Sequence, residues 1–273
     1  MSDQPDLFAF PAAHGERFLS GAPRKSPIAP ATLDDAALIA AIPTAGLPDA
    51  PALAREAGTR KLTSAVPVLE GLCNRFTGFG IDRPVPEQIA ALEALVAIGG
   101  LAAAQAVARL LTRRVIVGPG LKVGVAAAAQ LKSSLSPEVQ SVLLQHDDPS
   151  VRADACHCAR VAPEIVSVLI DLLDDLHEPV AMAAALALGR MSRPEARPLL
   201  LRLLMQAPTA EAMAAAAEIA DEECTVLIGR IARTVPGLSA AALNALATID
   251  NPLAARLRGL WADVEAGSAI AQT

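Results

Sequence analysis

The sequence predicts an all-α protein, an α-solenoid of stacked antiparallel helix pairs behind an irregular proline-rich arm. Hydrophobic residues make up 53% of the 273 residues, but aromatic residues make up only 2%. Alanine and leucine therefore dominate the apolar side chains, and both favour helices. Sandwiches and barrels draw on aromatic and β-branched residues, so this composition argues against them. The other two observations are a regular spacing of prolines and a repeated pattern of small residues.

Helix-breaking prolines return about every 30 residues, which is the spacing of a repeat architecture. They are Pro119, Pro149, Pro179, Pro208 and Pro236. The segments around these prolines share one frame: an apolar residue, two small residues four and five positions later, and then a small–apolar pair. Five segments fit, with origins at Ala90, Val123, Val151, Val180 and Leu238, and a sixth with its origin at Thr209 fits more loosely. Such units bury their apolar faces by stacking on one another.

Each unit is completed by a second helix rich in leucine and valine, often with proline in its first turn. The predicted ranges are 65–72, 101–111, 137–145, 163–173, 194–205, 222–233 and 252–263. Small side chains in the first helix of each pair allow neighbouring helices to approach closely, and leucine, isoleucine and valine fill the gaps. This packing accounts for the scarcity of aromatic residues without any functional explanation.

Three regions are expected: an arm at residues 1–57, the solenoid at 58–264 and a flexible tail at 265–273. Prolines are so dense up to Pro51 that the arm can form no long helix. One short helix is expected at 36–42, capped by Thr32 and Asp35 and ended by Pro43. Residues 6–10 are expected either to dock on another protein or to fold back on the solenoid.

Two segments resemble a known family. The turn at 147–152, Asp-Asp-Pro-Ser-Val-Arg, followed by Ala155 and Cys156, is similar to the D-x-x-V-R…A-A-x-A-L-G signature of HEAT repeats. Residues 178–189 are a second match, although Ala181 stands in the place of the arginine. The best likeness is to the short, PBS-lyase type, and it covers about residues 58–264. The resemblance implies a HEAT-like superhelix that acts as a non-enzymatic scaffold, adaptor or assembly factor.

A repeat stack of this kind is expected to bind a partner protein on its concave face and along its edge of turns. The inner helices between residues 180 and 220 carry few charges, so part of this face is expected to be apolar. An insert at 75–81 either caps the N-terminal end of the stack or docks on a partner. The basic turn with Arg113, Arg114 and Lys122 is expected either to be solvated or to hold an acidic group. The candidate residues for partner binding are Phe8, Phe10, Phe76, Phe79, Arg113, Arg114, Lys122, Asp154 and His157.

Stacking also suggests a weak metal site, because the turn at 145–148 would lie beside the turn at 174–178. Its candidate ligands are His146, Asp148, Asp175 and His177, although their spacing matches no known metal motif. The preferred interpretation is a solvated acidic turn with aspartates as helix caps. Cys156 and Cys158 point to different sides of a helix, so they cannot chelate one ion and are expected to pack as small apolar residues, as are Cys73 and Cys224.

No catalytic motif is present in the sequence, and neither a cofactor nor a metal is predicted. The net charge of −6 argues against a general nucleic-acid binder. No apolar run is long enough for a membrane span, and no secretory signal is seen, so a cytoplasmic location is expected. Two alternatives stay open. One is a chromophore-handling protein similar to bilin lyases with short HEAT repeats, and the other is a nucleic-acid binder similar to HEAT-like DNA glycosylases. The shortage of aromatic residues weakens both.

Overall fold

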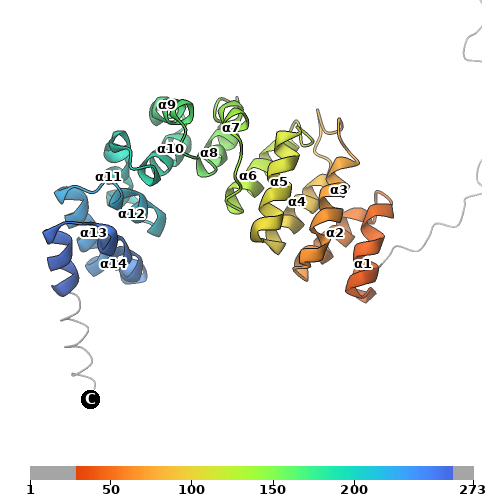
Figure 1. The fold of residues 1–273 in the computed structure, drawn as a ribbon, viewed down its shortest axis with the longest axis horizontal. Coiled ribbons are helices and arrows are strands. Elements are labelled where there is room, and N and C mark those ends of the chain that lie inside the picture. Colours follow the sequence, from red (N-terminus) through yellow and green to blue (C-terminus); the bar gives the residue numbers. More distant parts are fainter. Residues whose placement is uncertain (1–28, 261–273) are drawn as a thin grey trace, which may run out of the picture.

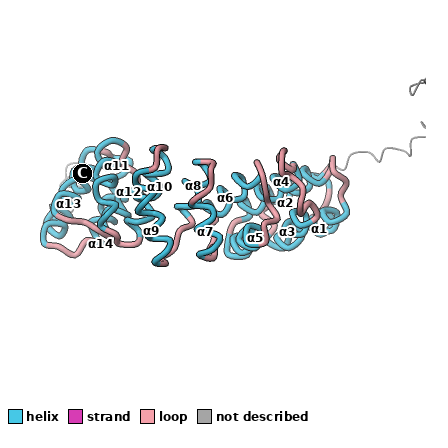
Figure 2. The backbone as a smooth tube through the Cα atoms, turned by 90° about the horizontal axis from the view of Figure 1, so that it is seen from above, coloured by secondary structure: helices cyan, strands magenta, loops and turns pink. Residues whose placement is uncertain are grey.

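The computed structural model describes residues 29–260, and this part of the chain contains helices and no strand. Figure 1 shows the described helices following one another in chain order along a curved arch. Seen from above in Figure 2, the helices succeed one another along a single axis, with α1 and α13 near opposite ends. The predicted Phe8, Phe10 and C-terminal tail lie outside the described residues.

The helices form two rows, and neighbours in the sequence pack as antiparallel pairs. In Figure 1, α6, α8, α10 and α12 lie on the inner side of the arch, and α7, α9 and α11 lie on the outer side. The inner row is α2 (Ala50–Thr59), α4 (Pro86–Ile98), α6 (Gly120–Gln130), α8 (Pro149–His157), α10 (Glu178–Arg190), α12 (Ala210–Ala217) and α14 (Ser239–Thr248). The outer row is α3 (Val66–Asn74), α5 (Gly100–Thr112), α7 (Pro137–Leu144), α9 (Pro163–Asp171), α11 (Arg197–Gln206), α13 (Glu222–Thr234) and the helical residues 252–260.

The all-α solenoid predicted from the sequence is confirmed. Every predicted second helix is found in the outer row, the last of them described as far as residue 260, and some have a 3₁₀ turn at one end. The predicted range 163–173, for example, is α9 followed by the 3₁₀ turn η4 (Leu172–Asp174), and the range 194–205 begins with η5 (Pro194–Ala196). The prolines at the first turns fit because the amide that proline lacks has no partner within the helix at that position.

The N-terminal part of the described chain is more helical than expected. The short helix α1 (Asp35–Ala41) is capped by Asp34, whose side chain accepts a 2.8 Å hydrogen bond from the amide of Ala37. The predicted cap was therefore wrong, because the Thr32 hydroxyl donates instead to the carbonyl of Ala29. A second helix, α2, also begins before residue 58 and packs on α4. The predicted boundary at residue 57 falls inside α2, because Pro51 occupies the first turn, where proline is tolerated.

The small residues of the inner row pack against neighbouring helices. In α10, Ala183, Ala184, Ala185 and Ala187 are all buried. At Gly189, a Cβ atom would lie 2.8 Å from the carbonyl oxygen of Ala215 in α12. These four alanines lie between helices, so they do not themselves supply the apolar inner face expected between residues 180 and 220.

The inner helices run in the same direction, so the two kinds of turn lie on opposite edges of the solenoid. The turns after the inner helices form what we call the C-terminal edge, and the turns before them form the N-terminal edge. Several turns of the C-terminal edge contain a residue with positive φ, such as Lys61, Gly99, Lys132 and Ser192. A left-handed residue of this kind ends an α-helix and exposes the following turn.

Candidate functional site

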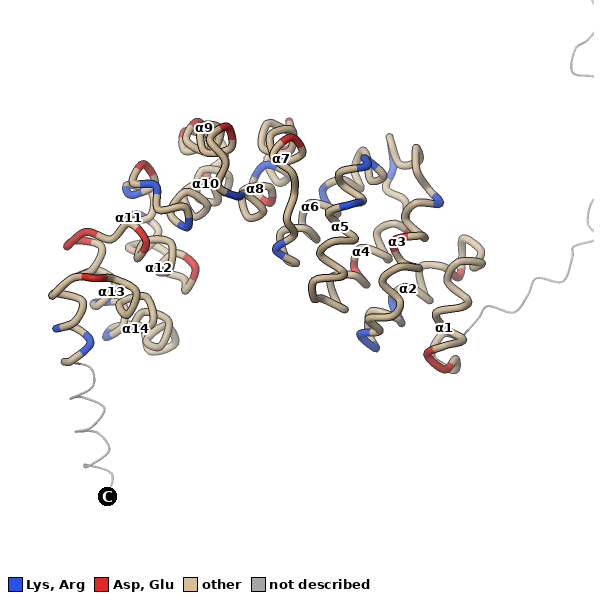
Figure 3. Tube along the Cα trace, viewed as in Figure 1, with Lys and Arg blue, Asp and Glu red and all other residues tan. Residues whose placement is uncertain are grey.

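A hollow on the inner side of the arch, which we call the concave pocket, crosses four successive inner helices. Its volume is about 880 Å³, and its walls come from α6, α8, α10, α12 and the turns that follow α6 and α8. Figure 3 shows Lys or Arg and Asp or Glu interspersed along this part of the arch. The charged and titratable residues that line the pocket are Lys132, Asp154, His157, Arg160, Arg190 and Glu211.

One acid of the concave pocket is neutralised and the other is not. The guanidinium of Arg190 donates to Glu211 at 2.7 Å, and the Nδ1 atom of His157 lies 3.6 Å from the same carboxylate. Asp154, in contrast, accepts no hydrogen bond and makes no ion pair within residues 29–260. Burial raises the pKa of Asp154, although the charges of His157 and Lys122 oppose this shift. A carboxylate of this kind can accept a hydrogen bond from a ligand or pair with a positive charge on it.

The turn after α6 brings donors to the same pocket. Lys132 has a φ of 53°, and the next amide, that of Ser133, closes the helix by donating to the carbonyl of Ala128 at 2.8 Å. The Ser133 side chain is buried, and its hydroxyl has no hydrogen-bond partner among the described residues. Buried polar groups are normally satisfied, so this hydroxyl is an unsatisfied group below the surface of the pocket.

Arg160 is held in place by a buried amide side chain. Gln140 accepts a hydrogen bond from the backbone amide of Arg160 at 3.2 Å and donates to the carbonyl of Leu135 at 2.8 Å. These bonds tie the turn after α8 to the turn before α7. Asp154 and His157 were predicted from the sequence, whereas Lys132, Ser133 and Arg160 were not. A basic residue at or just after the end of successive inner helices was the available signal.

The turns proposed as a metal site do lie together, but a structural network occupies them. The guanidinium of Arg152 donates hydrogen bonds to both carboxylate oxygens of Asp175, at 2.9 and 3.0 Å. It also donates to the carbonyls of His146 and Asp147. Asp148 caps α8 through the amide of Ser150, and its own amide donates to the Nδ1 atom of His146 at 3.0 Å. Within residues 29–260, no three His, Cys, Asp or Glu residues are placed to hold a metal ion. The weak metal proposal for His146, Asp148, Asp175 and His177 is therefore not supported.

The insert runs along the N-terminal edge rather than over the end of the stack, which α1 covers by packing on α2. The guanidinium of Arg75 lies 5.7 Å from the centre of the Phe76 ring, and the Phe76 and Phe79 rings meet edge to face at 6.3 Å. Phe76 packs on the core, whereas Phe79 is 62% exposed. Gly118 brings the next turn against the carbonyls of Gly80 and Ile81. The two roles expected for the insert, capping the stack or docking on a partner, therefore stay predictions.

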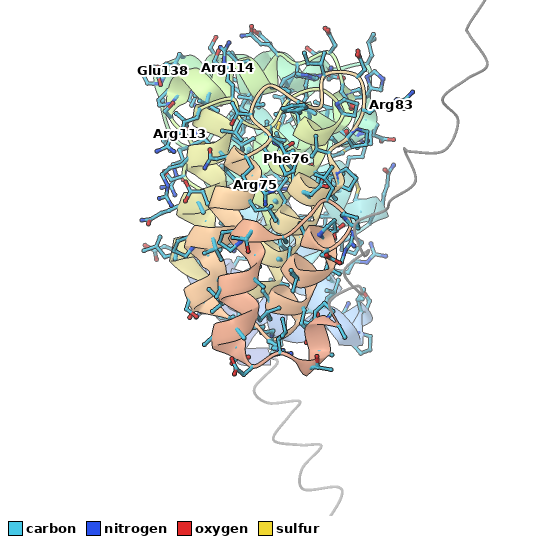
Figure 4. All side chains as sticks on the ribbon, turned by 90° about the vertical axis from the view of Figure 1, so that its right-hand side faces the viewer. Arg75, Phe76, Arg83, Arg113, Arg114 and Glu138 are labelled. Atoms are coloured by element: carbon cyan, nitrogen blue, oxygen red, sulfur yellow. The ribbon has the colours of Figure 1, made fainter. Side chains whose placement is uncertain are left out.

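The three basic candidates do not form one cluster. Arg113 and Arg114 project from the end of α5, and Figure 4 shows them on the same side of the molecule as Glu138. Arg114 and Glu138 line an apolar groove of about 570 Å³ beside α7. The charge of Lys122 instead acts on Asp148 and Asp154, which places it towards α8. The concave pocket therefore unites Asp154 and His157 and leaves Arg113 and Arg114 on a different edge.

The four cysteines are buried thiols, which confirms that they pack as small apolar residues. Cys73, Cys156 and Cys224 are fully buried, and Cys158 is 4% exposed. Burial raises the pKa of Cys73, Cys156 and Cys158 to about 12 and that of Cys224 to about 11. The thiolate is the reactive form, so these side chains are poor nucleophiles and poor metal ligands at neutral pH.

We expect none of the four thiols to react readily with Ellman's reagent at pH 7.5 in the folded protein, and all four to react in denaturant. A pKa raised by about three units lowers the thiolate fraction about a thousandfold. Because the folded-state pKa values are raised, their contribution to stability is complete below the unfolded value of about 8.5. It is lost as the pH rises from there towards 11 and 12, so urea titrations should show a decline over this range. A cysteine that reacts at the rate of a free thiol at pH 7.5 would contradict the structure.

The fold defines the class of the protein, an α-solenoid built from helix-pair repeats with a charged pocket on its inner face. Residues 136–220 match the family of HEAT repeats, so this part of the chain is built of HEAT repeats. The match includes α7 to α12 and thus most of the concave pocket. It is to HEAT repeats in general, so the short subtype stays a prediction. No curated protein matches the sequence. No helix among residues 29–260 has the length and apolar character needed to cross a membrane.

Proposed function

We propose that this protein is a non-enzymatic interaction scaffold that holds an extended segment of a partner protein in the concave pocket. HEAT repeats commonly act as scaffolds of this kind. The observation that carries the proposal is the pocket itself. It crosses four repeats, as a bound peptide would, and it holds charged side chains, such as Asp154 and Lys132, that make no ion pair within residues 29–260. The stacked helices present an extended surface of the kind that repeat proteins use for binding.

The chemistry of the pocket describes the segment it would hold. Lys132 and Arg160 can bind carboxylate oxygens or carbonyls, and Asp154 can accept a hydrogen bond from a peptide amide or pair with a basic side chain. The alanines between these groups, Ala126, Ala129 and Ala214, keep the surface shallow enough for a main chain to approach. We therefore expect a segment with both polar and small apolar residues, held mainly by hydrogen bonds and charges.

The test compares three full-length forms of the protein as bait in extracts of the native host, with quantitative mass spectrometry as the readout. They are the wild type, Asp154→Lys and Glu164→Lys. Asp154 lines the pocket, whereas Glu164 is exposed in the first turn of α9 on the outer row. Reversal of a charge within an interface commonly costs more than tenfold in affinity. We expect a partner that the wild type and Glu164→Lys retain and that Asp154→Lys loses. Equal recovery on all three baits would refute the proposed site.

Two further assays separate the alternatives. An absorbance titration with a linear tetrapyrrole would show a spectral shift if the protein handled bilins. A gel shift that weakens with salt would show nucleic-acid binding, because phosphate contacts depend on salt. Neither response is expected from a pocket in which positive and negative side chains alternate.

A further inference from the structure

A second hollow continues the concave pocket along the C-terminal edge. This hollow, which we call the edge groove, has a volume of about 720 Å³ and lies between the turn after α4 and the turn after α6. It shares Gln130, Lys132 and Arg160 with the concave pocket, so the two form one continuous surface. The edge groove goes beyond the site proposed for the partner, and its chemistry is different.

The edge groove is basic and apolar. No aspartate or glutamate lines it, and Lys132 and Arg160 have no ion-pair partner within residues 29–260. Arg109 also lines the groove, but its guanidinium is held by Glu70 at 2.7 and 2.9 Å. Leu101, in the groove wall, is 74% exposed, and Val161, next to Arg160, is 76% exposed. Two unpaired cations beside exposed aliphatic side chains suit a segment that combines carboxylates with large apolar residues.

The chain itself contains such a segment. Residues 3–10 read Asp-Gln-Pro-Asp-Leu-Phe-Ala-Phe, with two carboxylates followed by three large apolar side chains. They contain no basic residue, so their charge is opposite to that of the groove. Three of the five phenylalanines of the protein precede residue 20.

The described chain also begins on the C-terminal edge, the same edge as the edge groove. Arg60, at the end of α2, donates to the carbonyls of Pro30 at 3.2 Å and Leu33 at 2.8 Å. These bonds fix the start of the described chain on the C-terminal edge, beside the turn after α2. Lys132 lies at the corresponding turn two inner helices further on, about 20 Å away at the usual spacing between packed helices. Residues 11–28 can span up to about 60 Å when extended, so the distance is no obstacle.

We propose that residues 3–10 of the same chain bind in the edge groove. The carboxylates of Asp3 and Asp6 face Lys132 and Arg160. The side chains of Leu7, Phe8 and Phe10 cover the exposed apolar wall that includes Leu101. The docking does not depend on the function proposed above. One consequence does depend on it. Because the groove and the concave pocket share Lys132 and Arg160, the docked segment covers part of the proposed partner site, and a partner must displace the segment.

The test uses the full-length protein with the photoreactive residue p-benzoylphenylalanine in place of Phe8. After irradiation, the cross-linked peptides are mapped by mass spectrometry, and monomer and dimer bands are separated first. We expect cross-links within the monomer to residues 99–105 and 130–134. The double substitution Lys132→Glu and Arg160→Glu should reduce these cross-links about tenfold, the effect of losing two partly exposed charge pairs. Adding Asp3→Lys and Asp6→Lys to that variant should restore them.

The matched control is Arg113→Glu with Arg114→Glu, which reverses two exposed arginines on the other edge and should leave the cross-links unchanged. Circular dichroism and a melting curve check that every variant is folded. Three results would overturn the proposal: cross-links to the apolar groove beside α7, cross-links only in the dimer band, or cross-links scattered over the chain. Since no partner is present in this experiment, its outcome is separate from that of the bait comparison.

Discussion

Replacing Arg152 with alanine is expected to lower the free energy of unfolding by about 3 kcal/mol, the usual effect of removing one partner from a buried ion pair. The side chains of Arg152 and Asp175 are only 14% and 7% exposed. One guanidinium binds both carboxylate oxygens of Asp175 and the carbonyls of His146 and Asp147, so it ties the turn before α8 to the turn before α10. Its loss leaves a buried carboxylate and two carbonyls without their donor.

The measurement is urea unfolding followed by the helical circular dichroism signal. The control is Arg55→Ala, which removes the ion pair with Glu93 that links α2 and α4. Both of its side chains are about half exposed, at 56% and 50%, so this change should cost less than about 1 kcal/mol. Equal losses in the two variants would show that the Arg152 network is no more important than a surface pair.

The same variant should change the response to acid. Although burial by itself would raise the pKa of Asp175, the bonds from Arg152 and the His177 amide lower it overall. A lowered folded-state pKa contributes stability that is present above the unfolded value of about 3.9 and is lost as the pH falls through the folded value. The wild type should therefore lose stability below about pH 4, and Arg152→Ala should lose less of it over the same range.

Replacing Gly189 with alanine is expected to destabilise the protein by about 2 kcal/mol, even though alanine is the better helix former. A Cβ atom at this position would lie 2.8 Å from the carbonyl oxygen of Ala215 and 2.8 Å from the Cδ1 atom of Leu200. The backbone oxygen belongs to α12 and cannot move without shifting that helix. Overpacking at this contact would push α10 and α12 apart, and with them two walls of the concave pocket.

The matched control is Gly71→Ala in α3, where a Cβ atom would meet nothing within 4 Å. There the helix propensity alone should act, and stability should rise by up to about 1 kcal/mol. Urea titrations of both variants measure the difference. If Gly189→Ala proved as stable as Gly71→Ala, the close approach of α10 and α12 would have to be abandoned.

The repeat architecture was predictable because it depends on short-range patterns. The alternation of small residues with leucine and valine, and the prolines at helix starts, act within one or two turns of helix. They located α5, α9 and α13 to within a few residues. Helix α2 was missed because the dense prolines before it suggested an irregular arm, whereas Pro51 lies at the one part of a helix that tolerates it.

The candidate site was predictable only in part. Asp154 and His157 were proposed as partner-binding residues and do line one pocket, but the groups beside them come from other repeats. Lys132 and Ser133 follow α6, Arg190 ends α10, and Glu211 begins α12. A basic residue at or near the end of an inner helix is a signal within one repeat, but no local pattern shows which of these residues share a pocket. The metal proposal failed for a similar reason, because Arg152, which is distant in sequence from Asp175, takes up its carboxylate.

By itself, the sequence determined that the chain forms helices, where most of them begin and end, and that they repeat with a period of about 30 residues. These properties follow from backbone propensity and apolar periodicity, which neighbouring residues set. Only the tertiary structure decided which charged side chains neutralise one another and which are left free on the inner face. That outcome depends on how far each helix is offset and rotated against the next, and contacts such as Gly189 with Ala215 set this geometry across the repeats.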